Sequence, residues 1–175
     1  MLLDRGASMH STYTDWKSTP LHMAARGGHI EVVKLLLDRG ASIHCTDYWT
    51  STALHVAAKR GHIEVVKLLL DRGASIHSPD HWMSTPLHKA AEEGHIEVVQ
   101  VLLDRGARIH STDARKSTPL HMAAEGGHTE VVNVLLDRGA RIDATNDKEW
   151  TAFHLARSRG HIEVMKVLLD WGENN

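Results

Sequence analysis

The sequence repeats itself with a period of 33 residues, and this period constrains the fold more than any other feature of the chain. A threonine that opens a Thr-Pro-Leu-His or closely related motif recurs at Thr19, Thr52, Thr85, Thr118 and Thr151. Self-similarity at a fixed spacing of this length indicates stacked supersecondary units that share one elongated core. Residues common to every copy therefore belong to the structural frame, and function is expected where the copies differ.

The period divides the chain into a single continuous array, residues 1–175, without linkers between the units. A partial repeat is predicted at residues 1–17, and a C-terminal partial or capping repeat at 150–175. Four full repeats are predicted between them, at 18–50, 51–83, 84–116 and 117–149.

Each unit predicts two helices and a projecting loop. In the first full unit, Thr19 is expected to cap a short helix and Pro20 to occupy its first position, where a missing N–H costs nothing. Gly28 can adopt the positive φ that turns the chain back, and a second helix then runs to Gly40. This second helix is apolar over more than one stripe, as expected for a helix with neighbours on both sides. The polar residues 41–51 that follow predict a turn-containing loop.

The motif Thr-Pro-Leu-His, followed by the run Gly-His-Ile-Glu-Val-Val, resembles the ankyrin repeat over essentially the whole chain. The resemblance implies an all-α solenoid of stacked helix-turn-helix units with projecting β-hairpin loops. It also implies that the loops and the first helices line a concave surface that binds other proteins. One feature departs from the family: the loop position that usually holds glycine is occupied by Lys17, Thr50, Met83, Lys116 and Glu149, which leaves the turn geometry open.

Fifteen histidines raise the question of catalysis or metal binding. Ten of them recur in register beside the two helix starts of each unit. A group needed once for catalysis has no reason to recur in every unit, so these ten are expected to make structural hydrogen bonds. They are His22, His55, His88, His121 and His154 in the first helices, and His29, His62, His95, His128 and His161 before the second.

A third histidine series, at His10, His44, His77 and His110, stands where each loop leaves the second helix. One imidazole per layer, about 10 Å apart for normally packed helices, is too sparse for a single zinc ion. Two alternative functions remain open for this series. One is a metal-binding histidine array, and the other, implied by the ankyrin resemblance, is hydroxylation of His44, His77 or His110 by an oxygen-dependent asparaginyl hydroxylase. Solvated loop histidines are the simpler interpretation.

The composition argues against the other functional classes. Twenty Lys and Arg stand against 22 Asp and Glu, so no net charge favours nucleic acid or anionic lipid. The sequence has no phosphate-binding loop or nucleophile elbow, and Cys45 is its single cysteine. No apolar run approaches the roughly 20 residues of a membrane span, and no secretory leader follows Met1. The sequence thus predicts a soluble, cytoplasmic, monomeric protein that is not an enzyme, needs no cofactor or metal, and binds a protein partner.

The differences between copies gather at the loop tips. Three residues before the repeated threonine stand Trp16, Trp49 and Trp82, followed by Arg115 and Lys148. Equivalent loop positions are expected about 10 Å apart, as in packed helices, which is too far for the rings to stack directly. Because Trp also dominates binding hot spots, contact with a partner is favoured over stiffening of the loop row.

The candidate protein-binding surface combines these tips with variable positions of the first helices. It comprises Trp16, Tyr48, Trp49, His81, Trp82, Met83, Arg115, Trp150, Met23, Arg26, Val56, Lys59, Arg60, Lys89 and Glu92. The first helices change from basic to acidic along the array, and their acidic residues Glu92, Glu93 and Glu125 have two open interpretations. They either hold Arg115 and Lys116 within the array or present a charged flank to a partner.

The near-identity of the structural frame also bears on the origin of the chain. An engineered or selected de novo binder and a recently duplicated natural array would both show it. The clustering of differences at the loop tips and first helices favours the engineered origin.

Overall fold

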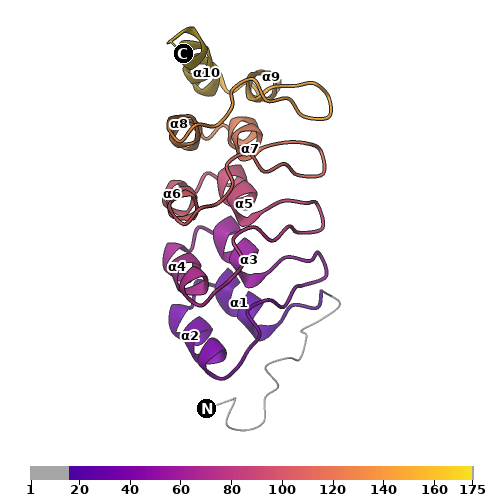
Figure 1. Cartoon of the computed structure of the whole chain (residues 1–175), viewed down its shortest axis with the longest axis vertical. Coiled ribbons are helices and arrows are strands. Elements are labelled where there is room, and N and C mark those ends of the chain that lie inside the picture. The colour runs from indigo at the N-terminus through magenta and orange to yellow at the C-terminus, as the bar shows by residue number, and fades with distance from the viewer. Residues whose placement is uncertain (1–15, 175) are drawn as a thin grey trace.

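The computed structural model describes residues 16–174, which form an elongated stack of helix pairs (Figure 1). The helices described are α1 (Pro20–Arg26), α2 (Ile30–Asp38), α3 (Ala53–Lys59), α4 (Ile63–Asp71), α5 (Pro86–Glu92), α6 (Ile96–Asp104), α7 (Pro119–Gly126), α8 (Thr129–Asp137), α9 (Ala152–Arg159) and α10 (Ile162–Asn174). The odd-numbered helices contact one another in an inner row and the even-numbered helices in an outer row, so that each pair forms one layer. This is the predicted all-α solenoid. Most of the partial repeat predicted at 1–17 lies outside the described residues.

The inner helices begin as the sequence predicts, and glycine is needed where the chain turns to the outer row. Thr85 has extended backbone before α5, and Pro86 takes the first helical position. Between α3 and α4, Gly61 adopts a φ of +72°, and a Cβ there would lie 2.6 Å from Nδ1 of His95 in the next layer. Backbone conformation and the packing of the next layer thus both require glycine at this turn.

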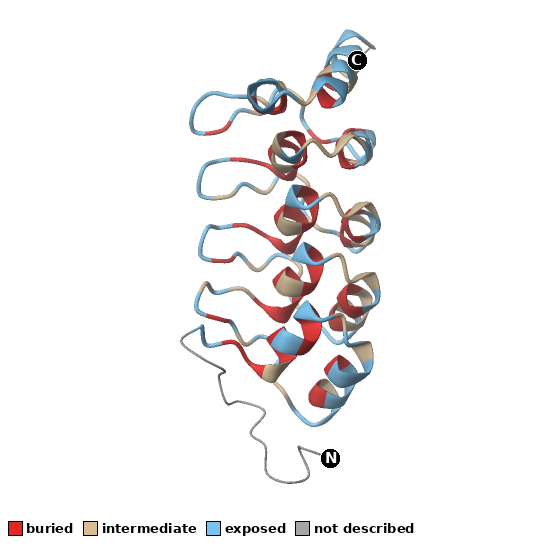
Figure 2. Ribbon diagram, turned by 180° about the vertical axis from the view of Figure 1, so that it is seen from behind, coloured by how far each residue is buried: buried red, intermediate tan, exposed pale blue. Residues whose placement is uncertain are grey.

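The core lies between the two rows and continues from layer to layer (Figure 2). In the layer of α3 and α4, Leu54, Ala57, Val66 and Leu69 are each no more than 1% exposed. Small alanines let the inner helices approach one another, and the larger side chains fill the space between the rows. Since each layer buries its apolar surface against its neighbours, the stack is stabilised layer by layer.

Four projecting loops within residues 16–174 close as hairpins whose turns are each organised by one Asp or Asn side chain. In the loop after α4, Oδ1 of Asp80 accepts hydrogen bonds from the backbone N–H groups of Trp82 and Ser84, both at 2.9 Å. The backbone N–H of Met83 donates to the carbonyl oxygen of Asp80, also at 2.9 Å. The same side-chain acceptor recurs at Asp47, Asp113 and Asn146.

The hairpin turn therefore forms without the glycine that ankyrin repeats usually place there. All five residues at this position adopt a φ between 50° and 61°: Lys17, Thr50, Met83, Lys116 and Glu149. An L side chain in the left-handed region costs about 1 kcal/mol, and a β-branched residue such as Thr50 is especially unfavourable there. The hydrogen bonds of the turn hold this conformation against the local strain.

Candidate functional site

Four histidines form a buried row along the inner helices, which we call the histidine row: His22, His55, His88 and His121. In the second layer, the backbone N–H of Thr52 donates to Nδ1 of His55 at 3.2 Å, and Oγ1 of Thr52 lies 2.9 Å from the same nitrogen. Nε2 of His55 lies 3.1 Å from the carbonyl oxygen of Ser84 in the next layer. Because Nδ1 accepts a hydrogen bond, Nε2 carries the proton and donates it to this carbonyl.

Burial keeps the imidazoles of the histidine row neutral. Desolvation lowers the pKa of His22, His88 and His121 below the ordinary value of 6.5, and lowers the pKa of His55 to about 4. A proton added at Nδ1 would also break the hydrogen bond from the threonine backbone. Both ring nitrogens are therefore used by the fold, which confirms the structural role predicted from their register.

The second histidine series links the layers at the C-terminal ends of the inner helices. Nε2 of His62 lies 3.0 Å from the carbonyl oxygen of Arg26, and Nε2 of His95 lies 3.1 Å from that of Lys59. The same contact is repeated by His128 with Glu92 and by His161 with Glu125. These carbonyls belong to the last turns of helices, where they have no intrahelical partner, so the contacts are structural, as predicted.

The hairpin tips are joined to one another through the backbone. The N–H of Tyr48 donates to the carbonyl oxygen of Trp16 at 2.9 Å, and the N–H of His81 donates to that of Trp49 at 2.8 Å. The same bond continues through the later layers, from Ala114 to Trp82 and from Asp147 to Arg115. Neighbouring tips thus approach each other like paired strands, which are much closer together than packed helices.

The tryptophans at these tips stack, so the prediction that they lie too far apart to do so is wrong. The ring centroids of Trp16 and Trp49 are 4.5 Å apart with an angle of 36° between the planes, and those of Trp49 and Trp82 are 6.5 Å apart at 25°. The prediction used the spacing of the helices, whereas the backbone hydrogen bonds set the spacing of the tips. The rings therefore form one continuous aromatic strip across three layers.

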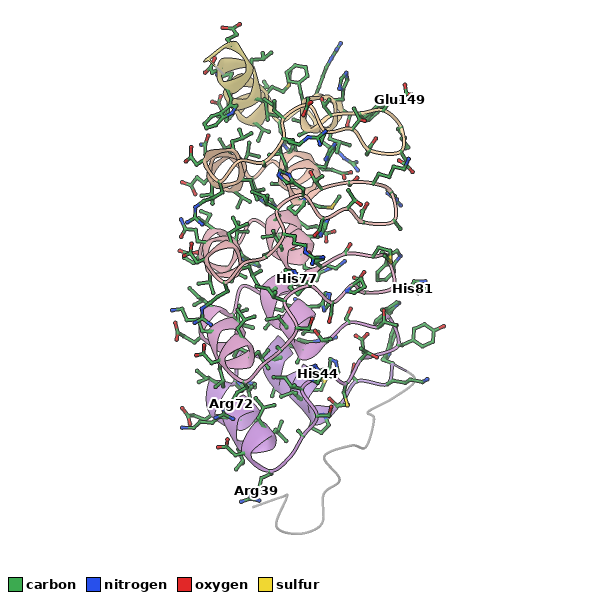
Figure 3. The ribbon with its side chains drawn as sticks, in the orientation of Figure 1. Arg39, His44, Arg72, His77, His81 and Glu149 are labelled. Atoms are coloured by element: carbon green, nitrogen blue, oxygen red, sulfur yellow. The ribbon has the colours of Figure 1, made fainter. Side chains whose placement is uncertain are left out.

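Much of the aromatic strip and its surroundings is exposed. Trp16 is 51% exposed and Trp82 49%, while Trp49 between them is half-buried. Tyr48 and Met83 are more exposed still, at 64% and 53%. Figure 3 shows His81 at a hairpin tip, with Glu149 at the tip of a later hairpin. The strip thus presents a large apolar surface on a preformed backbone.

Two adjoining clefts separate the hairpins from the inner helices. The larger has a volume of about 840 Å³ and is lined by residues that include Trp82, Glu92, Arg115, Met122 and Trp150. The smaller has a volume of about 300 Å³, and Arg26, Trp49, Val56, Lys59, Arg60 and Trp82 are among its lining residues. Of the remaining predicted contact residues, Lys89 lines both clefts, whereas Trp16, Tyr48, His81, Met83 and Met23 lie outside them on exposed surface.

The side chain of Lys89 makes its main contacts within the array. Its Nζ lies 2.9 Å from Oδ2 of Asp80, an ion pair whose alignment is not that of a hydrogen bond. The Asp80 side chain is fully buried and that of Lys89 only 13% exposed. The same ammonium lies 5.4 Å from the ring centroid of Trp82, within cation–π range. Lys89 therefore ties α5 to the hairpin and offers little surface to a partner.

Two of the three acidic residues at the C-terminal ends of the inner helices pair with cations of a neighbouring layer, and the third lies near a lysine of its own helix. Nζ of Lys59 lies 3.4 Å from Oε1 of Glu93, and Arg159 forms an ion pair with Glu125. Glu92 lies 4.0 Å from Lys89. Across residues 16–174, no ion pair joins these carboxylates to Arg115 or Lys116, so that interpretation of the acidic group is wrong.

The third histidine series is exposed where the hairpins leave the helices. His44, His77 and His110 are all exposed, and Figure 3 shows the first two at the base of their loops. Their hydroxylation stays a prediction, and His10 lies outside the described residues. Between residues 16 and 174, no group of three or more His, Cys, Asp or Glu side chains gathers that could hold a metal ion. In the same range, no helix is long and apolar enough to cross a membrane.

Sequence reasoning missed the residues that shape the tips and a set of ion pairs on the outer face. The turn acceptors Asp47, Asp80, Asp113 and Asn146 recur with the period of the array, so the period itself carried the signal. On the outer face, Nη1 of Arg72 donates to Oδ1 of Asp38 at 2.7 Å, and two further Arg–Asp pairs repeat this contact in later layers. Figure 3 shows Arg72 on the side opposite the hairpins.

Comparison with known proteins agrees with this architecture. A family model described as "Ankyrin repeats (3 copies)" matches residues 1–80, 52–113 and 87–175, so the matches together span the chain. No curated protein matches it. Ankyrin repeats generally mediate protein–protein interaction and are typically non-catalytic scaffolds. The family matches, the repeated motif and the stacked helix pairs together show that the chain belongs to the ankyrin-repeat family.

Proposed function

We propose that this chain is a non-catalytic protein-binding module whose partner contacts the aromatic strip and the two adjoining clefts. The observation that carries the proposal is the aromatic strip, because the fold does not need it. Arg115 and Lys148 occupy the equivalent positions in the next two hairpins, and those hairpins make the same turn and the same backbone bonds between tips. The hairpins therefore do not require tryptophan at this position in order to fold.

The physical character of the strip suits it to binding. Stacked rings on a hydrogen-bonded backbone lose little conformational freedom when a partner arrives, so more of the contact surface is converted into affinity. Trp, Tyr and Arg are the side chains that contribute most to interface hot spots. Trp16, Tyr48, Trp82 and Met83 combine exposure with large apolar surface.

The recurring histidines support a module without catalysis. In the histidine row, both ring nitrogens of each imidazole are engaged in hydrogen bonds within and between layers. A ring held in this way has no nitrogen left to act as a general base.

A paired pull-down tests the proposal. The bait carries Trp49→Ala and Trp82→Ala, and the matched control carries Arg108→Ala and Arg157→Ala, which truncate two exposed side chains outside both clefts. We expect proteins retained by the wild-type and control baits to be lost from the tryptophan variant. Because each stacked aromatic pair contributes about 1 kcal/mol, the tryptophan variant should lose some stability but remain folded in a urea denaturation experiment. Equal retention by all three baits would contradict the proposal.

A further inference from the structure

The cationic side chains at the ends of the inner helices differ in whether they form an ion pair within the described residues. Lys59 pairs with Glu93, and Arg159 pairs with Glu125. Arg26, at the end of α1, and Arg60, just after α3, are both exposed. Among the described residues, neither of these arginines has a carboxylate within 4.0 Å.

Both of these arginines line the smaller cleft, together with two tryptophans of the aromatic strip. Trp49 and Trp82 form the hairpin side of this cleft, and Val56 adds apolar surface from α3. The cleft therefore places two guanidinium groups beside an apolar wall.

The two carboxylates that line the smaller cleft are already engaged. Oδ1 of Asp47 accepts two backbone N–H groups at 2.9 Å, and Asp47 is 6% exposed. Oδ1 of Asp80 does the same, and its Oδ2 is paired with Lys89. Neither carboxylate is placed to neutralise Arg26 or Arg60, so the cleft retains an excess of positive charge.

We infer that the partner is a protein segment in which Asp or Glu side chains flank an aromatic or large aliphatic residue. This inference rests on the proposed function and adds the chemical class of the partner. The apolar residue packs against Trp49, Trp82 and Val56, and the carboxylates pair with Arg26 and Arg60, whose planar guanidinium groups suit bidentate contact with carboxylate.

The charge along the groove also sets the direction of the bound segment. The residues equivalent to Arg26 in the third and fourth full repeats are Glu92 and Glu125, so positive charge gives way to negative charge along the inner helices. A bound segment therefore places its acidic end over α1 and α3. Its other end lies toward α5 and α7, where the larger cleft is lined by Glu92 and Glu125 but also by Arg115 and Lys148, so that neither charge is favoured.

A random-sequence peptide library displayed on phage tests this chemistry directly. The library is selected on the wild-type protein and, in parallel, on the Trp49→Ala/Trp82→Ala variant. We expect peptides enriched on the wild type alone to carry Asp or Glu beside an aromatic or large aliphatic residue. Neutral or basic peptides that still require the tryptophans would overturn the inference and leave the proposed function standing. Absence of enrichment over the tryptophan variant would contradict both.

Charge reversal then locates the contact. Calorimetric titration with a synthetic copy of an enriched peptide should show at least tenfold weaker binding to Arg26→Glu/Arg60→Glu. Arg108→Glu/Arg157→Glu makes the same charge change at exposed positions outside both clefts and should leave the affinity within about twofold. Replacing the acidic residues of the peptide by Lys should restore its binding to the reversed protein. Unchanged affinity in the first variant would refute the contact.

Two further measurements test whether positive charge in the cleft is the cause and whether carboxylate is the group that it binds. Arg26→Gln/Arg60→Gln removes the charge without reversing it and should weaken binding in the same direction; thermal melts check that every variant is folded. A peptide with phosphoserine in place of its Asp or Glu residues provides the competing source of negative charge. Tenfold tighter binding of the phosphorylated peptide would assign the cleft to phosphate instead of carboxylate and overturn the inference.

Discussion

Two rows of side chains run the length of this array, and they connect its layers in opposite ways. The histidine row is buried, has one residue type, and joins each layer to the next through the side chain. The tip row, which consists of Trp16, Trp49, Trp82, Arg115 and Lys148, joins its layers through backbone hydrogen bonds whatever the side chain, and ring stacking is added only where the side chain is tryptophan. A row whose side chain makes the connection cannot vary, whereas a row connected by its backbone leaves the side chain free to serve another purpose.

The largest effect that we expect is a loss of folding stability at low pH, caused by protonation of the histidine row. The folded state holds the pKa of these imidazoles below 6.5, so below that pH the unfolded chain binds protons that the folded chain does not. Stability is therefore complete above pH 6.5 and falls as the pH drops toward the folded pKa, which is about 4 for His55. That shift corresponds to about 3 kcal/mol for His55 alone when both states are fully titrated. Urea denaturation between pH 7.5 and 4.5 measures the loss.

A single-layer variant sharpens the acid experiment. His55→Asn should be less stable at neutral pH but lose less of its remaining stability on acidification. The control is His154→Ala, because His154 is exposed and its Nε2 has no acceptor in a following layer within the described residues. The control should retain the wild-type pH dependence. An unchanged pH dependence in His55→Asn would show that the histidine row does not carry the effect.

The second test compares the turn acceptors beneath the tip row. Asp113→Asn should cost less than about 1 kcal/mol, because Asn146 already performs the same role in the next hairpin. Asp80→Asn should cost about 3 kcal/mol, because it leaves the ammonium of Lys89 nearly buried without its partner. Equilibrium unfolding in urea separates the two values. The double variant Asp80→Asn/Lys89→Met, which carries the methionine found at the equivalent positions 23 and 122, should recover most of the lost stability. If it does not, the lost stability belongs to the turn and not to the unpaired lysine.

The smallest expected effect is a gain. Thr50→Gly and Lys116→Gly place glycine at positions where the backbone φ is positive, which removes the steric strain of an L side chain. Each should stabilise the protein by about 1 kcal/mol. Thr50 lies in a hairpin with tryptophan and Lys116 in one without, so similar gains would show that the turn is independent of the tip side chain. A gain confined to Lys116→Gly would mean that the aromatic strip supports the turn at Thr50. Thermal denaturation resolves a difference of this size.

The fold could be predicted from the sequence because each layer repeats the same local signals. Threonine caps, Pro20 and the turn glycines act within a few residues, and their recurrence with a fixed period identified the layers. The stacking of Trp49 between its neighbours was not predictable in the same way. It depends on backbone hydrogen bonds between residues one period apart, and those bonds bring the tips closer together than the helices that carry them.

The candidate site was predictable only in its composition. Position-by-position comparison found the variable residues that line the clefts, including Arg26 and Arg60, but could not tell free charges from paired ones. Lys89 looked equivalent to Met23 and Met122, yet it is tied to Asp80 in the preceding hairpin. The pair joins a lysine found at this position in one repeat to an aspartate that recurs in other repeats, and only the three-dimensional distance shows that the two side chains meet.

The aromatic strip also gives the molecule an optical signature of its own. Indole rings whose centroids are 4.5 Å and 6.5 Å apart are close enough for their electronic transitions to couple, which produces paired circular-dichroism bands of opposite sign. The helix bands lie in the same far-ultraviolet region, so the tip signal is read as the difference between the spectra of the wild type and the Trp49→Ala/Trp82→Ala variant. The chain thereby reports the geometry of its own tips without any added label.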